Sequence, residues 1–118
     1  MSDAIIQFFA AWGMEDAEAR ATSIRDSVAP AFHYLDPRTP EPISSFDDLV
    51  AYVAMYTQYA PGASAEVRNL SETSGHFRAT VAFCMADGQV QMGQYFIECD
   101  TDNRPVRLIG FAGLGDPA

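Results

Sequence analysis

The first residues that could do chemistry are a tyrosine and an aspartate that precede Pro37. Asp36 stands directly before this proline, and Tyr34 lies two residues earlier in a run with strand character. Because side chains alternate along a strand, Tyr34 and Asp36 share one face. A partly desolvated carboxylate can take part in proton transfer, and a phenol beside it can donate a hydrogen bond. An aspartate before a proline commonly bonds its own turn backbone, and the residues taken alone favour that role, with proton transfer left open as the alternative.

Gln94 is a third candidate, because a predicted hairpin puts it on an apolar face. Two alternating runs, 76–85 and 90–99, flank the dipeptide Asp87-Gly88, which predicts antiparallel strands joined by a two-residue turn. In that register Gln94 is the one polar side chain on its face, and an amide buried there without a partner costs about 1 to 3 kcal/mol. We therefore expect Gln94 to bond a ligand, a water or a protein group. Its expected neighbours on this face are Val81, Phe83, Met92 and Phe96.

The opposite face of the same hairpin is also apolar. In the predicted register it carries Thr80, Tyr95 and Ile97, which do not suit a sheet face left in water. Since three helices are needed to cover the first face, we expect a second copy of the chain to cover this outer face in a homodimer packed sheet against sheet. The alternative is a monomer with an open apolar face.

The two cysteines and two histidines do not indicate a disulfide or a metal site. Cys84 and Cys99 lie far apart along the predicted ladder, so we expect two free thiols. His33 and His76 have no His or Cys beside them at ligand spacing. We therefore expect neither a metal ion nor another cofactor.

The elements that would position these residues follow from the spacing of apolar side chains. Apolar residues at helical spacing predict three helices, over residues 3–13, 16–29 and 45–59. Alternating and β-branched runs predict strands, over residues 32–36, 65–71, 76–85, 90–99 and 106–113. Helices before strands predict one α+β domain spanning residues 1–118, in which three N-terminal helices pack on a curved, mainly antiparallel sheet.

Composition excludes several classes of partner and mechanism. Sixteen acidic and seven basic residues give a net charge of -9, which repels nucleic acid and anionic membranes. All seven basic residues are arginines, so lysine Schiff-base chemistry is excluded. No apolar run approaches the roughly 20 residues that a membrane span needs. We expect a cytoplasmic protein.

The order of elements, with Phe8-Phe9-Ala10-Ala11-Trp12 near the start and a strand that ends at Asp36-Pro37, resembles the nuclear transport factor 2-like superfamily. This superfamily includes SnoaL-like proteins and ketosteroid isomerase. The resemblance covers nearly the whole chain in pattern. It implies a cone-shaped fold, in which a strongly bent sheet wraps around a long helix and an apolar pocket opens between them.

Within the isomerase branch, the resemblance implies roles for individual residues. The family's general base matches Asp36. Its oxyanion hole consists of a tyrosine on the first helix and a protonated aspartic acid on the strand after the hairpin, and these positions fall on Phe8 and Gln94. A phenyl ring donates no hydrogen bond and an amide is neutral, so the resemblance implies weaker stabilisation of an oxyanion here.

The resulting prediction is a small-molecule pocket protein of the SnoaL-like type. It is an acid/base isomerase, or a related lyase or hydrolase, of a small apolar carbonyl or ring compound. Asp36 is the predicted base, assisted by Tyr34 and Gln94. The alternative is a non-catalytic ligand-binding or dimerisation module. The residues expected to contact the ligand are Phe8, Trp12, Tyr52, Phe83, Met92, Phe96 and Phe111.

Overall fold

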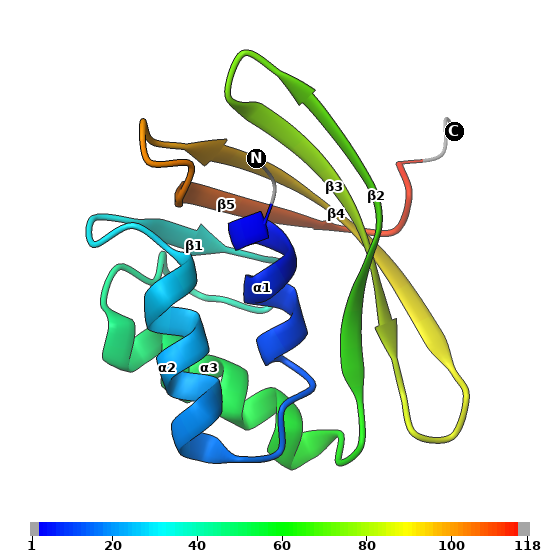
Figure 1. Cartoon of the computed structure of the whole chain (residues 1–118). Helices are drawn as coiled ribbons and strands as arrows, with labels where there is room; N and C mark the ends of the chain where they lie inside the picture. Colours follow the sequence, from blue (N-terminus) through cyan, green and yellow to red (C-terminus); the bar gives the residue numbers. More distant parts are fainter. Residues whose placement is uncertain (1–2, 116–118) are drawn as a thin grey trace.

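Three helices cover one face of a five-stranded sheet in the computed structural model, which describes residues 3–115 (Figure 1). The sheet has the strand order β1-β5-β4-β3-β2, in which β1 runs parallel to β5 and the other neighbours are antiparallel. The α+β class and the predicted order of elements are confirmed. The elements are α1 (Asp3–Ala11), α2 (Ala17–Ser27), β1 (His33–Leu35), α3 (Phe46–Tyr59), β2 (Ser64–Thr73), β3 (His76–Cys84), β4 (Val90–Cys99) and β5 (Pro105–Ala112).

Side-chain caps begin two of the helices. The Asp16 carboxylate accepts a hydrogen bond from the backbone N–H of Ala19 at 2.8 Å and begins α2. The Ser45 hydroxyl accepts one from the N–H of Asp48 at 3.1 Å and begins α3. Each cap satisfies a backbone donor that has no partner within the helix. None of the helices in residues 3–115 has the length and apolar character needed to cross a membrane.

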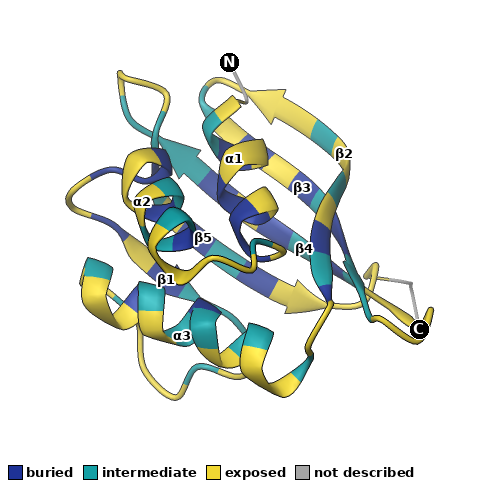
Figure 2. Ribbon diagram, turned by 60° about the horizontal axis from the view of Figure 1, so that its bottom comes forward, coloured by how far each residue is buried: buried dark blue, intermediate teal, exposed yellow. Residues whose placement is uncertain are grey.

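The core lies between α1 and the concave face of the sheet. Phe8 and Phe9 on α1 are fully buried, and the ring of Phe9 packs edge-on against Tyr95 of β4 at 4.8 Å. Figure 2 shows the buried residues gathered on the surfaces that the helices and the sheet turn toward each other. α1 therefore provides the packing against which the sheet bends.

The predicted register of the β3–β4 hairpin is wrong by one residue. Cys84 pairs with Val90, and the loop between the strands has the backbone bonds Gly88 N–H to Met85 O at 3.0 Å and Met85 N–H to Gln89 O at 2.8 Å. Gly88 has a φ of 94°. A turn followed by a left-handed glycine makes a three-residue loop with a bulge, rather than the two-residue turn that was predicted.

A slip of one residue turns every β4 side chain to the other face of the sheet. Tyr95 and Ile97, predicted on the outer face, are 3% and 0% exposed and belong to the core. Gln94 and Phe96, predicted on the inner face, lie on the outer face, where Phe96 is 37% exposed and stacks on His76 at 5.9 Å. On β4, Gln94 and Phe96 therefore lie on the outer face, in place of the predicted Tyr95 and Ile97.

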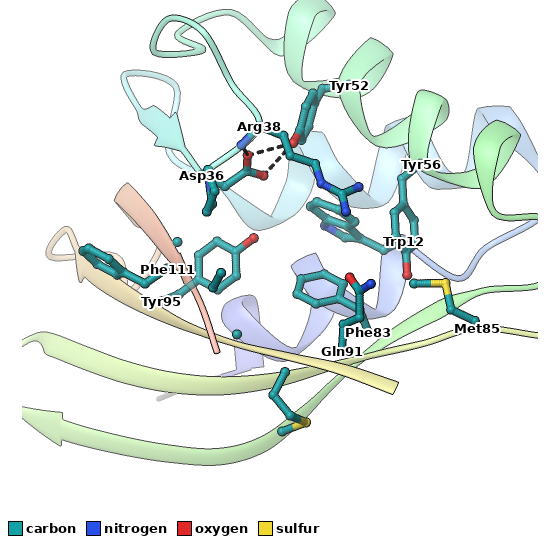
Figure 3. Close-up of a pocket in the computed structure, with 15 residues that line it drawn as sticks. Trp12, Asp36, Arg38, Tyr52, Tyr56, Phe83, Met85, Gln91, Tyr95 and Phe111 are labelled. Atoms are coloured by element: carbon teal, nitrogen blue, oxygen red, sulfur yellow. Dashed lines mark hydrogen bonds between the residues drawn. The ribbon is translucent and has the colours of Figure 1, made fainter. Parts of the chain in front are cut away.

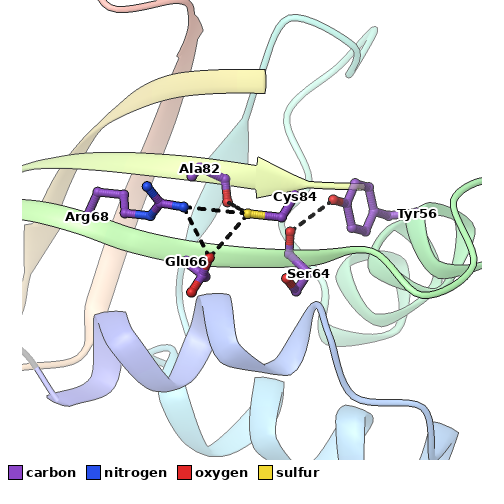
Figure 4. Close-up of polar contacts among 6 residues, drawn as sticks. All are labelled: Tyr56, Ser64, Glu66, Arg68, Ala82 and Cys84. Carbon is purple, nitrogen blue, oxygen red and sulfur yellow. Dashed lines mark hydrogen bonds and ion pairs between the residues drawn. The ribbon is translucent and has the colours of Figure 1, made fainter. Parts of the chain in front are cut away.

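Both cysteines are free thiols, as predicted. Cys84 donates a hydrogen bond to the Glu66 carboxylate at 3.2 Å on the outer side of β2 and β3, and Arg68 pairs with the same carboxylate at 3.3 Å (Figure 4). Burial raises the pKa of the Cys99 thiol to about 11. Cys99 is therefore a thiol rather than a thiolate at neutral pH.

Candidate functional site

A pocket of about 150 Å³ opens between α1, α3 and the strands β3, β4 and β5 (Figure 3). Six of its fifteen lining residues are aromatic, and one carboxylate, Asp36, lies among them. Its lining residues are Trp12, Asp36, Pro37, Arg38, Tyr52, Tyr56, Phe83, Met85, Gln91, Met92, Gly93, Tyr95, Gly110, Phe111 and Ala112.

A tight turn after β1 fixes the position of Asp36. The N–H of Thr39 donates to the backbone oxygen of Asp36 at 3.1 Å, and the N–H of Arg38 donates to Oδ1 of Asp36 at 2.8 Å. This is the self-bonded turn that the residues taken alone favour as the role of Asp36. Asp36 also lines the pocket, so the structural and the pocket roles occur together.

Two phenols donate hydrogen bonds to the Asp36 carboxylate from different elements. Tyr34 on β1 donates to Oδ2 at 2.7 Å, and Tyr52 on α3 reaches Oδ2 at 2.6 Å and Oδ1 at 2.8 Å. The hydroxyl oxygen of Tyr34 lies 2.7 Å from that of Tyr95 on β4. Since Tyr34 has one hydroxyl proton and gives it to Asp36, Tyr95 is the donor in this second bond.

Burial keeps these phenols protonated. Desolvation raises the pKa of Tyr34 well above its ordinary value, and it also raises the pKa of Tyr95 and of Tyr52. The nearby Asp36 charge acts in the same direction on all three. At neutral pH the three side chains are therefore hydrogen-bond donors rather than bases.

Gly110 makes room for this network. It pairs with Tyr95 across β4 and β5, and a Cβ atom at Gly110 would lie 2.8 Å from the Tyr95 ring and 3.2 Å from the Asp36 Cβ. Both distances are shorter than ordinary van der Waals contact. A glycine inside a predicted strand is the one sequence signal that could have indicated such a close approach.

Trp12 forms the inner wall of the pocket and is the single tryptophan of the chain. Its ring lies 5.2 Å from that of Tyr56, 5.7 Å from Phe83 and 6.2 Å from Tyr52. Its indole Nε1 is buried and has no hydrogen-bond partner within residues 3–115. The neighbouring Tyr56 hydroxyl donates its proton to the backbone oxygen of Ser64 at 3.3 Å (Figure 4).

Comparison with solved structures identifies the fold. A protein of the SnoaL-like family from Agrobacterium tumefaciens, described as an isomerase, superimposes with a TM-score of 0.84 at 20% identity over 95% of this chain and 96% of that one. A protein from Jannaschia described as a SnoaL-like polyketide cyclase gives 0.74 at 14% identity, over 92% and 82%. This chain has the nuclear transport factor 2-like fold.

A third protein with this fold was solved with a small molecule bound. It is a protein with a ketosteroid isomerase-like fold from Catenulispora acidiphila in complex with trimethylamine, and it gives a TM-score of 0.75 at 9% identity, over 95% of this chain and 86% of that one. No protein-family model and no curated protein matches the sequence. The nuclear transport factor 2-like fold is therefore identified by structural similarity, without a match in sequence.

Within this fold, most of the predicted site residues lie together. Asp36, Trp12, Tyr52 and Phe83 line the pocket. Met92 and Phe111 border it from β4 and β5, although the register turns both toward the outer face. Tyr34 is fully buried behind Asp36, and Phe8 is fully buried beside it with ring centroids 6.0 Å apart. Both support the wall rather than line it.

Two predicted site residues lie outside the pocket. Gln94 is on the outer face of β4, where its Nε2 donates to the backbone oxygen of Leu114 at 3.1 Å. Phe96 is on the same outer face. The cause in both cases is the bulged loop at Gly88, which shifts the register by one residue.

The sequence missed other lining residues. The correct register would have indicated Tyr95 and Gln91, and Tyr56 lies one helical turn after the predicted Tyr52 on α3. Arg38 carries no distinguishing pattern. Residues 3–115 contain no group of three or more His, Cys, Asp or Glu side chains arranged to hold a metal ion. The pocket chemistry that these residues offer is therefore that of one carboxylate, several phenols and one guanidinium.

Proposed function

We propose that this protein is an acid/base isomerase of a small apolar carbonyl compound, with Asp36 as the general base. One observation carries the proposal: the only carboxylate among the pocket-lining residues is hydrogen-bonded to two phenols at 2.6 and 2.7 Å. A carboxylate and phenol donors around an apolar space suit removal of a proton next to a carbonyl group.

In the proposed reaction, Asp36 takes a proton from the carbon next to the ligand carbonyl. The electron pair of that C–H bond becomes the enolate, and its oxygen accepts a hydrogen bond from a phenol. Asp36 then returns the proton to another carbon of the same system, which gives the isomer with no net oxidation or reduction.

Tyr95 is the proposed donor to the enolate oxygen, because it lines the pocket and is bonded to Asp36 through Tyr34. While Asp36 is ionised, the bonds run from Tyr95 to Tyr34 to Asp36. Once Asp36 holds the substrate proton it can donate to Tyr34, and Tyr34 can then donate to Tyr95. The Tyr95 proton is thereby released toward the ligand at the moment when negative charge develops there.

Conversion of cyclohex-3-enone to the conjugated cyclohex-2-enone tests this proposal, since ultraviolet absorbance follows the product. We expect Asp36→Asn to lower the rate at least 100-fold and Tyr95→Phe to lower it roughly 10- to 100-fold. Arg107→Gln is the control, because Arg107 is exposed, pairs with Glu98 at 2.9 Å and lies outside the pocket. A wild-type rate no higher than that of Asp36→Asn would contradict the proposal.

The alternative is a binding module without turnover. The aromatic walls around Trp12 and the trimethylamine complex of the Catenulispora acidiphila protein support it, because aromatic faces attract quaternary and tertiary ammonium ions. In that case an alkylammonium ion would quench or shift the Trp12 fluorescence, and cyclohex-3-enone would not be isomerised.

We also propose a homodimer formed through the outer face of the sheet. Phe96 is 37% exposed there and pairs with Ile109 of β5, which gives the face an apolar centre. A cytoplasmic location is supported by the two free thiols, which suit a reducing compartment.

A further inference from the structure

Arg38 differs from the other six arginines in having no partner for its side chain within residues 3–115. Four arginines pair with carboxylates, and these are Arg25, Arg68, Arg104 and Arg107. Arg20 donates to the backbone oxygen of Met14, and Arg78 donates to the Ser71 hydroxyl. In a chain with a net charge of -9, a guanidinium without any side-chain or backbone partner in the described residues is available to an external anion.

The guanidinium of Arg38 lies at the pocket. Figure 3 shows it extending from the turn after β1 over Trp12, on the side of the pocket where Gln91 and Tyr56 lie. Burial raises the pKa of Tyr52 and of Tyr56, and the Arg38 charge acts in the opposite direction on both. The electric field of Arg38 therefore reaches the interior of the pocket.

Two donors of the pocket have no partner within residues 3–115, and the Gln91 amide beside them can both donate and accept. The two oxygens of Asp36 already accept bonds from Tyr34, Tyr52 and the backbone N–H of Arg38, and an incoming ligand reaches this carboxylate by displacing the Tyr52 hydroxyl. The buried Nε1 of Trp12 has no partner within the described residues, and the guanidinium of Arg38 is a further free donor. A ligand that completes these bonds brings acceptor oxygens.

We propose that the ligand carries a carboxylate, and that Arg38 binds this carboxylate at the mouth of the pocket. The proposal rests on the proposed function for the placement of the reacting carbonyl at Asp36. A planar guanidinium matches a carboxylate in charge and shape. Arg38 supplies one positive charge to the pocket, and the protein as a whole is strongly acidic. A ligand group with one negative charge is therefore favoured over a phosphate dianion. The substrate class is therefore a small apolar carbonyl compound with a carboxylate at its outer end.

Three probes of similar size and different charge test the proposal: phenylacetate, phenylacetamide and phenethylammonium. Trp12 is the single tryptophan and lines the pocket, so its fluorescence reports binding directly. We expect phenylacetate to bind about 10-fold more tightly than the amide, and phenethylammonium to bind most weakly. In Arg38→Gln, the affinity for phenylacetate falls about 10-fold and that for the amide changes less than 2-fold. Arg107→Gln, the matched control outside the pocket, changes neither.

Tighter binding of phenethylammonium than of phenylacetate would overturn the proposal, as would equal losses for the acid and the amide in Arg38→Gln, or no binding of any probe. Since none of the probes is isomerised, the result does not depend on turnover. Asp36→Asn separates the two proposals, because it should abolish isomerisation and retain phenylacetate binding. If the Arg38 effect is present and isomerisation is absent even in the wild type, the carboxylate site stands and the proposed reaction fails.

Discussion

Hydrogen bonds hold Asp36 in one orientation, and that orientation faces the pocket. The backbone N–H of Arg38 holds Oδ1, and the hydroxyl of Tyr34 holds Oδ2. Tyr34 is fully buried, so this side of the carboxylate is fixed. Tyr52 is half-buried and comes from α3, so its hydroxyl is the donor that an incoming ligand can displace. A base that is positioned before the ligand arrives loses little entropy on binding.

Gly110 provides a test at the scale of one residue. In Gly110→Ala the new methyl group would lie 2.8 Å from the Tyr95 ring and 3.2 Å from the Asp36 Cβ. We expect the isomerisation rate to fall 10-fold or more, because a displacement of about 1 Å at reacting groups costs up to roughly 100-fold. The assay of cyclohex-3-enone conversion measures this change.

Gly13→Ala is the matched control, because its Cβ meets the Ser64 side chain at 3.0 Å and Gly13 lies outside the Asp36 pocket. It should lower the melting temperature without lowering the rate per folded molecule. A Gly110→Ala protein with unchanged activity would show that the positions of Tyr95 and Asp36 do not matter to the reaction.

At the scale of elements, local sequence patterns predicted the helices and strands, but they did not predict the register of the β3–β4 hairpin. The sequence Asp87-Gly88 fits a two-residue turn, and it fits equally well a three-residue loop in which Gly88 is left-handed. The choice is made by packing across the sheet, where Tyr95 meets Phe9 at 4.8 Å. Because one residue of slip exchanges the faces, Gln94 was predicted in the pocket in place of Tyr95.

The sequence also did not predict which distant segments pair in the sheet. β1 pairs in parallel with β5, which aligns Tyr34 with Leu108, and nothing in either strand marks this neighbour. Asp36 was predictable because it precedes Pro37 and because the order of elements resembles a known fold. Arg38 was not, since an exposed arginine has no pattern of its own and its importance appears once the pocket and the other arginine pairs are known.

For the molecule as a whole, the outer face of the sheet is the surface that a second copy would cover. We expect the wild type to be a dimer in light scattering at micromolar concentration. Phe96→Asp should yield a folded monomer, because it places a charge in the apolar centre of that face. Thr101→Asp adds the same charge in the exposed loop between β4 and β5 and should leave the dimer intact. A monomeric wild type would rule the dimer out.

The central claim is that Asp36 removes a proton from a carbonyl compound bound in the pocket. Exchange of the hydrogens next to the carbonyl of cyclohexanone for deuterium, followed by proton NMR in heavy water, measures that step alone. We predict that the wild type exchanges these hydrogens at least 100-fold faster than Asp36→Asn at equal concentration. Equal exchange by the two proteins, at the rate of buffer without protein, would contradict the account.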